Sequence, residues 1–222
     1  MWSSRPSSSF AARPAERRYA RRVTTPLLVK ICGLRTTDAI DVAVDAGADA
    51  IGFVHAAGSP RAVDVATARA LVEHVAGRAT TVLVIKGIGP EAATMAAQEA
   101  GVDVLQVHGY DRARTERALE LLPRVWRATS PGGDLDPWGE ELLLIDSPRA
   151  GSGERWDLRA LLERRPTGPW LLAGGLDPDN VARAIRDARP AGVDVSSGVE
   201  SAPGVKDLAR IERFVSNARA AG

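Results

Sequence analysis

Eight short apolar segments, most of them separated by segments with helical periodicity, predict an α/β protein: a parallel, eight-stranded (β/α)8 (TIM) barrel. The apolar segments are mostly continuous rather than alternating, as expected for strands of a parallel sheet that is buried on both faces. All eight units fit within residues 27–222, and closing them into a barrel leaves no sheet edge to cover. We therefore expect residues 27–222 to form a single catalytic domain.

Turn and cap residues divide these units. The expected strands are residues 28–32, 49–54, 80–85, 103–107, 124–128, 142–146, 170–173 and 193–195. The expected helices are residues 39–47, 63–75, 90–101, 111–122, 156–165, 177–188 and 206–220. Thr36, Thr37 and Asp38 cap the first helix, Pro90 opens the third and Gly101 closes it. Residues 129–141 are rich in turn formers and lack helical periodicity, so the fifth helix of the barrel is expected to be degenerate.

Composition limits the function classes. The chain has 45% hydrophobic and 26% charged residues, as ordinary globular proteins do, and no apolar run approaches the length of about 20 residues that spans a membrane. Its one cysteine excludes an intrachain disulfide and suits a reducing compartment, so we expect a cytoplasmic protein. The formal net charge is +1, although residues 1–26 hold six arginines and a single acid, Glu16. The rest of the chain is therefore slightly acidic, which argues against nucleic-acid binding.

Residues 1–26 differ from the rest of the chain. They are rich in arginine, serine and alanine and lack the apolar core of a secretory signal. We interpret them as a disordered extension or the product of a misassigned start codon, with an organellar targeting segment as the alternative. The barrel is assigned to residues 27–222.

Two loops predict a phosphate site. Gly174 and Gly175 follow the seventh strand, and Ser196, Ser197 and Gly198 follow the eighth. Glycines let backbone N–H groups approach an anion, and serine hydroxyls add donors. Tight turns alone would explain either loop, but barrels often bind phosphate at this pair of loops.

A thiol and a carboxyl group are candidates for acid–base chemistry. Cys32 ends the first strand and Asp146 ends the sixth, so both are expected at the mouth of the barrel. An apolar wall would raise the pKa of Asp146 and favour an acid, and Lys30, on the same strand face as Cys32, could lower the pKa of the thiol. The simpler alternatives are an inert buried cysteine and an aspartate that caps a turn.

Other polar residues at the mouth are less specific. Arg61, after the second strand, could pair with a carboxylate, although on its own a solvated loop arginine is the simpler interpretation. His108 ends the fourth strand and is expected to point into the mouth. No metal-ligand spacing occurs, and the dinucleotide-like Gly87-Ile88-Gly89 lacks an acid at the end of the next strand. We therefore expect neither a metal nor a cofactor.

Several motifs in order resemble the phosphoribosylanthranilate isomerase family of tryptophan biosynthesis. They are KICGL at 30–34, DAIGFV at 49–54, SPR at 59–61, LQVHG at 105–109, LLLIDS at 142–147, LAGGLDPDNV at 172–181, DVSSGVES at 194–201 and PGVKD at 203–207. The resemblance covers nearly all of residues 27–222 and coincides with the strand ends described above.

The resemblance implies a cofactor-free Amadori rearrangement of a phosphosugar. It implies that Asp146 is the general acid that opens the ribose ring and that Cys32 is the base that removes the C2′ proton. It further implies that Arg61 holds the anthranilate end and that the loops at 174–175 and 196–198 hold the phosphate. Lys30 and His108 are expected to contribute to substrate binding, and the protein to be a monomer or a homodimer.

The chain also departs from the family pattern. Ile85-Lys86-Gly87 stands where an FVN-like segment is usual, His55-Ala56-Ala57 where an aromatic residue is usual, and Ala150–Glu154 in place of GGTGK. These changes leave two alternatives open: a barrel that acts on another aminoaldose phosphate, and a non-catalytic barrel that retains the phosphate site. The aspartate pair that is typical of the histidine-pathway isomerase is missing, because the first strand ends in a cysteine.

Overall fold

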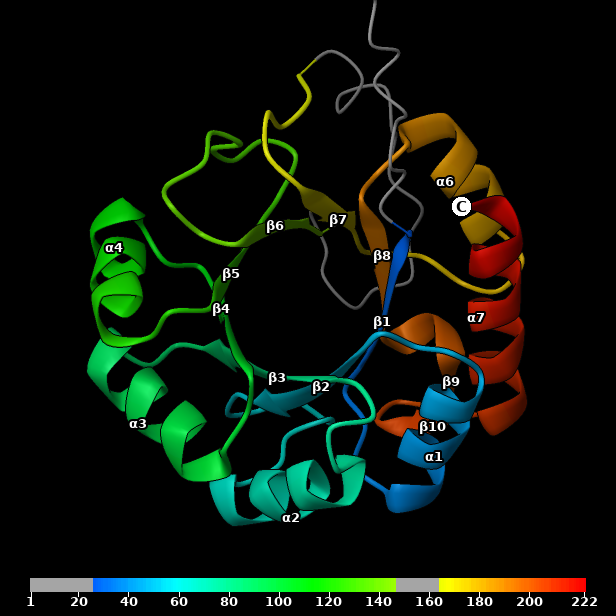
Figure 1. Ribbon diagram of the computed structural model, residues 1–222, viewed down its shortest axis with the longest axis horizontal. Helices are drawn as coiled ribbons and strands as arrows, with labels where there is room; N and C mark the ends of the chain where they lie inside the picture. The colour runs from blue at the N-terminus through cyan, green and yellow to red at the C-terminus, as the bar shows by residue number, and fades with distance from the viewer. Residues whose placement is uncertain (1–25, 147–163) are drawn as a thin grey trace, which may run out of the picture.

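The computed structural model describes residues 26–146 and 164–222, and its strands close into one barrel (Figure 1). Every strand pairs in parallel with its sequence neighbour, and β1 pairs with β8. The eight strands are β1 (Leu28–Cys32), β2 (Ala50–His55), β3 (Thr80–Lys86), β4 (Val104–His108), β5 (Val125–Thr129), β6 (Leu142–Ile145), β7 (Trp170–Leu172) and β8 (Gly192–Val195). The predicted (β/α)8 fold is confirmed.

Helices surround the strands in a ring, as Figure 1 shows. They are α1 (Thr37–Asp45), α2 (Val65–Val75), α3 (Pro90–Ala100), α4 (Arg112–Leu121), α6 (Val181–Ala188) and α7 (Leu208–Ala221). The chain after β8 adds a short 3-10 turn, η1 (Ser197–Val199), and a hairpin of β9 (Glu200–Ala202) and β10 (Val205–Lys206). The sequence did not predict the hairpin. The helix expected at 156–165 and the segment Ala150–Glu154 lie almost entirely outside the described residues.

Side-chain caps explain most helix boundaries. Thr36 Oγ1 accepts a hydrogen bond from Ala39 N at the start of α1, as predicted, and Gly101 ends α3 in the left-handed conformation. The helix expected from residue 177 begins only at Val181, because Asp177 Oδ1 accepts the backbone N–H groups of residues 179 and 180 in a capping turn. No helix in the described part of the chain is long and apolar enough to span a membrane.

The strands bury two different faces. Alternate residues of each strand point outward against the helices, where Val29 and Ile31 of β1 join the larger apolar core. The others point into the barrel, where Cys32 packs in a smaller cluster with residues of the other strands. Cys32 therefore belongs to the inner face, and its position at the end of β1 brings it to the mouth.

The missing fifth helix is confirmed, since residues 130–141 form turns only. In place of a helix, the loop after β5 is held by hydrogen bonds to Arg127 of β5. Its Nε donates to Glu140 at 2.9 Å, its Nη1 and Nη2 donate to the carbonyls of Asp134 and Asp136, and its guanidinium lies 3.8 Å from the ring centroid of Trp138. The loop is therefore ordered around one buried cation rather than by helical hydrogen bonds.

Candidate active site

The carboxyl ends of the strands bring the predicted acid and base to one rim. Cys32 is the last residue of β1 and is 6% exposed, whereas Asp146 follows directly after β6 and is half-buried. A Cβ atom at Gly52, the register partner of Cys32 on β2, would lie only 3.0 Å from the sulfur. The glycine inside the second strand thus makes room for the thiol.

A buried ion pair lies one layer below the thiol. Lys30 Nζ donates to Asp194 Oδ1 at 2.8 Å, and the lysine side chain has no exposed area. Burial alone would lower the pKa of Lys30, but the charges of Asp194 and Cys32 and hydrogen bonds to both raise it above its ordinary value. Lys30 therefore stays charged beneath Cys32. A side chain without exposed area offers no surface to a ligand, so this geometry does not support direct substrate contact by Lys30.

Several charges act on Cys32 at once. Burial raises the pKa of the thiol above its ordinary value; the positive charges of Lys30 and Lys206 oppose this, and the negative charge of Asp194 adds to it. The net direction is upward, so the lysines reduce the effect of burial without overcoming it. Lys30 acts in the predicted direction, and Lys206 is a second cation that the sequence reading did not assign.

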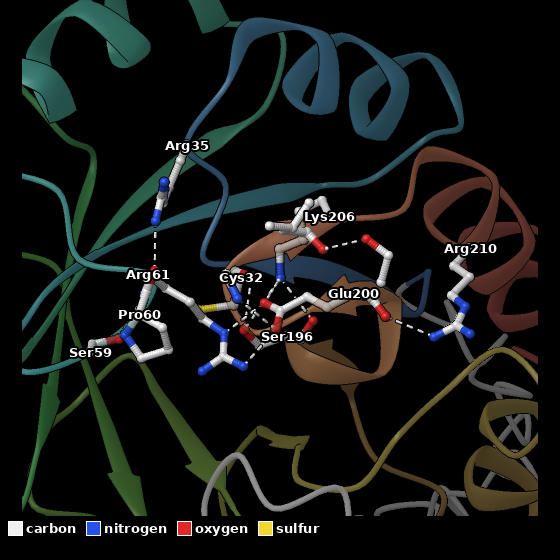
Figure 2. Close-up of polar contacts among 12 residues, drawn as sticks. Cys32, Arg35, Ser59, Pro60, Arg61, Ser196, Glu200, Lys206 and Arg210 are labelled. Atoms are coloured by element: carbon white, nitrogen blue, oxygen red, sulfur yellow. Dashed lines mark hydrogen bonds and ion pairs between the residues drawn. The ribbon is translucent and has the colours of Figure 1, made fainter.

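Arg61 is held by Glu200 of the hairpin. Its Nε and Nη2 donate to the two carboxylate oxygens of Glu200 at 2.7 and 2.8 Å, while Nη1 has no partner among the described residues. Lys206 Nζ donates to Glu200 Oε1 at 2.9 Å and to Ser196 O at 2.8 Å. Figure 2 shows these side chains converging beside Cys32. Arg61 is therefore a fixed side chain at the mouth, not a solvated loop arginine.

The two predicted phosphate loops pack against each other. A Cβ at Gly198 would come within 1.8 Å of the Leu176 carbonyl oxygen, so only glycine allows this approach. Gly174 and Gly175 have φ values of 79° and 64°, which favour glycine. The backbone N–H groups at this junction make no hydrogen bond within the described residues: Gly174, Gly175, Ser197 and Gly198. Unpaired N–H groups on adjacent loops can receive an anion.

His108 lies at the end of β4 with its ring held from below. The Nε2 atoms of Gln106 and His108 are 2.8 Å apart, an arrangement in which the amide donates and the ring nitrogen accepts. Burial, followed by the charges of Lys30 and Lys86, lowers the pKa of His108 to about 4. The imidazole is therefore neutral at physiological pH, and its remaining nitrogen carries the proton as a donor.

Comparisons with known proteins agree with this arrangement. The family model for N-(5'-phosphoribosyl)anthranilate (PRA) isomerase matches residues 29–217. The chain belongs to the PRA isomerase family. A curated N-(5'-phosphoribosyl)anthranilate isomerase from Beijerinckia indica is 43% identical over 213 residues, which cover 87% of this chain and 95% of that protein.

Solved PRA isomerase structures share the fold as well as the sequence. The crystal structure of TrpF from Jonesia denitrificans is 52% identical with a TM-score of 0.82, and the match covers 88% of this chain and 98% of that one. A PRA isomerase in complex with reduced 1-(o-carboxyphenylamino)-1-deoxyribulose 5-phosphate is 30% identical with a TM-score of 0.77 and covers 87% of this chain and 99% of that one.

In this PRA isomerase family member, the predicted residues lie at four places on the mouth. Cys32, with Lys30 below it, lies beside the Arg61 cluster, and Ser196 links the two by donating from Oγ to Cys32 O at 3.1 Å. Gly174, Gly175, Ser197 and Gly198 form the loop junction. Asp146 follows β6, two strands from β8 around the barrel, and His108 is the last residue of β4.

Sequence reasoning missed three charged residues of the candidate site: Asp194, Glu200 and Lys206. Asp194 carried a signal, because it and Lys30 are charges inside otherwise apolar runs that meet where the barrel closes. Glu200 and Lys206 lie in motifs that carried the resemblance, but their pairing depends on the hairpin turn at Gly204. Among the departures from the family pattern, His55 is fixed by a 3.0 Å contact from Nδ1 to Val63 O, and Lys86 lies exposed next to His108 in register.

Proposed function

We propose that this chain catalyses the Amadori rearrangement of N-(5-phospho-β-D-ribosyl)anthranilate to 1-(2-carboxyphenylamino)-1-deoxy-D-ribulose 5-phosphate. The reaction is an aldose–ketose isomerisation in tryptophan biosynthesis. The observation that carries the proposal is the grouping, on one barrel rim, of a thiol, a carboxyl group, an arginine and a loop junction. Among the described residues, one corner of the arginine and the backbone N–H groups of the junction have no partner. These groups match the needs of a substrate with a carboxylate at one end and a phosphate at the other.

The acid and base can act from opposite sides of such a substrate. Asp146 donates a proton to the ribose ring oxygen, the bond from that oxygen to C1′ breaks, and the anilino nitrogen lone pair forms the Schiff base. The thiolate of Cys32 then removes the C2′ proton. The electron pair of the broken C2′–H bond forms the C1′=C2′ double bond, and the π pair of the Schiff base returns to nitrogen to give an enolamine. Tautomerisation to the ketone oxidises C2′ as C1′ is reduced, so no external oxidant is needed.

The two anionic ends position C2′ between the catalytic groups. Arg61 Nη1, which has no partner among the described residues, can donate a charge-assisted hydrogen bond to the anthranilate carboxylate. The amides at Gly174, Gly175, Ser197 and Gly198, with the hydroxyl group of Ser197, can bind the phosphate, whereas the Ser196 hydroxyl proton is taken by Cys32 O. Neutral His108 can donate one hydrogen bond without adding charge. Holding both ends lowers the entropic cost of bringing C2′ to the thiolate.

Turnover of enzymatically generated phosphoribosylanthranilate, followed by the loss of its fluorescence, tests the proposal directly. We expect saturable turnover without added metal or nucleotide, and rescue of a tryptophan auxotroph that lacks this step. Failure of both assays with folded protein would contradict it and favour one of the alternatives, which the same assay with another aminoaldose phosphate would separate.

The assembly and the compartment stay predictions from the sequence. A monomer and a homodimer are both compatible with the barrel, and light scattering of the purified chain would distinguish them. A cytoplasmic location, expected from the single free cysteine, is testable by fractionation of the source cells.

A further inference from the structure

The carboxylate of Glu200 is saturated with donors. Its Oε1 accepts from Arg61 Nε and Lys206 Nζ, and its Oε2 accepts from Arg61 Nη2 and from the backbone N–H of Gly204 at 3.2 Å. The side chains of Glu200 and Lys206 are each 4% exposed. A carboxylate with four donors in such a buried place holds its neighbours in one geometry.

The geometry of Arg61 follows from this contact. Because Glu200 takes the Nε–H and one Nη2–H, the guanidinium plane is fixed, and the corner formed by Nη1 and the second Nη2–H has no partner among the described residues. The Arg61 side chain is 16% exposed, so this corner can be reached from the mouth. Glu200 therefore decides which part of Arg61 a ligand meets.

Lys206 sets the net charge of the cluster that it forms with Arg61 and Glu200. Arg61 and Glu200 alone would form a neutral pair, and Lys30 and Asp194 form another. Lys206 adds one buried cation to the first pair, so the cluster is net positive. An anionic ligand is attracted by the whole cluster, and this attraction is strong where water is excluded.

Lys206 also connects this cluster to Cys32. Its ammonium donates to Ser196 O, and the Ser196 hydroxyl donates to Cys32 O. The charged groups that act on the thiol come from four elements: Lys30 of β1, Asp194 of β8, Lys206 of β10 and Arg61 of the loop after β2. Figure 2 shows Cys32 between Arg61 and Lys206. Of these groups, Lys206 is the cation that the hairpin contributes.

We propose that Glu200 and Lys206 are positioning residues of the reaction: Glu200 orients Arg61 toward the substrate carboxylate, and Lys206 supplies the remaining positive charge and places it beside Cys32. The role in substrate binding rests on the proposed function, whereas the effect on Cys32 exists without any substrate. The two parts are therefore tested separately.

The thiol gives a direct readout because Cys32 is the only cysteine in the chain. The rate of its alkylation by iodoacetamide, measured from pH 6 to 10, reports the thiolate fraction in the absence of substrate. We expect Lys206→Met to shift this profile to higher pH and to slow alkylation about three- to tenfold at pH 8, where a pKa rise of one unit is tenfold in thiolate. Lys206→Arg keeps the positive charge, so its alkylation profile should lie at least halfway back from that of Lys206→Met to that of the wild type.

A purely structural role would give another result. If Lys206→Met only loosened the hairpin, Cys32 would become more accessible and alkylation would be faster at every pH, without a shift of the profile. Such an outcome, or an unchanged profile with folding confirmed by circular dichroism, would overturn the role of Lys206. Neither result depends on whether the chain turns over phosphoribosylanthranilate.

Glu200→Gln tests the orientation of Arg61 with a side chain of the same shape. The amide keeps one acceptor but loses the charge that binds both Arg61 nitrogens, so we expect KM to rise about tenfold and kcat to change less than about threefold. Glu73→Gln is the matched control, since Glu73 also pairs with an arginine but lies 69% exposed on α2. An unchanged KM, or a fall in kcat as large as the fall in kcat/KM, would overturn the role of Glu200.

Discussion

Two largely buried arginine–glutamate pairs among the described residues differ in the guanidinium nitrogens that they leave without a partner. Arg127 and Glu140, on the wall without a helix, are each 2% exposed, and every guanidinium nitrogen of Arg127 donates within the protein. Arg61 and Glu200, at the mouth, are 16% and 4% exposed, and Nη1 of Arg61 has no partner among the described residues. Figures 1 and 2 show the wall loop between β5 and β6 and the mouth cluster, respectively.

The difference in unused donors distinguishes a structural arginine from one that can bind a ligand. A guanidinium whose donors are all used inside the fold has nothing to offer a ligand, and its removal leaves several buried acceptors unsatisfied. A guanidinium with one unused corner is held in place by the carboxylate and can still donate to a ligand. Substitution of Arg127 should therefore lower stability, and substitution of Arg61 should lower kcat/KM.

Arg127→Met is expected to give the largest change in stability. It leaves Glu140 as a buried, uncompensated charge and removes the donors of the Asp134 and Asp136 carbonyls, so the free energy of unfolding should fall by about 3–5 kcal/mol. Urea denaturation measures this directly. At low temperature, kcat/KM of the folded variant should stay within about threefold of wild type.

Arg124→Met is the matched control for Arg127. Arg124 also forms a bidentate pair, with Glu141, but both side chains are about 40% exposed, so we expect a loss below about 1 kcal/mol. Equal losses for the two variants would refute the contrast between buried and exposed pairs on this wall.

Cys32→Ala and Asp146→Asn should each lower kcat at least about 100-fold, because each removes one of the two groups that we propose transfer protons. Thermal unfolding should show that both variants stay folded. Near-wild-type turnover of either variant would rule out the proposed mechanism while leaving the structural comparison of the two arginines intact.

Arg61→Met should lower kcat/KM about 10- to 100-fold, as expected when one charge-assisted hydrogen bond to the substrate is lost. The free energy of unfolding should change by only about 1 kcal/mol, because Glu200 retains Lys206 and the Gly204 N–H. Steady-state kinetics and urea denaturation on the same preparation check both statements. A destabilisation as large as that of Arg127→Met would make the mouth arginine a structural residue too.

The pH dependence of kcat/KM tests the thiol without any substitution. Burial raises the pKa of Cys32, so the thiolate is the minor form at neutral pH, and kcat/KM should rise by up to tenfold per pH unit until the pH passes that pKa. His108 contributes no step near pH 6.5, since its pKa is about 4. The Arg127→Met variant should show the wild-type profile, whereas a kcat/KM that falls as pH rises from 6 to 8 would contradict a thiolate base.

Much of the site could be predicted from the strand ends. Cys32, Asp146 and the Gly174-Gly175 and Ser196–Gly198 loops were found because a parallel barrel brings the carboxyl ends of all its strands to one rim. The roles assigned to these residues stay predictions. Lys30 was assigned to the substrate as well as to the thiol, and the structure places it under Cys32 with Asp194, because a charge inside a packed barrel must be paired.

The sequence by itself determined the barrel, its missing fifth helix and the residues at its rim, because hydrophobic periodicity and turn residues are local patterns that can be read directly along the chain. Only the tertiary structure decided which charges meet. The Arg61–Glu200 and Lys30–Asp194 pairs join residues 139 and 164 positions apart, and no local pattern encodes such a contact. Chain closure places them together, and the low polarity of the interior makes each pairing decisive.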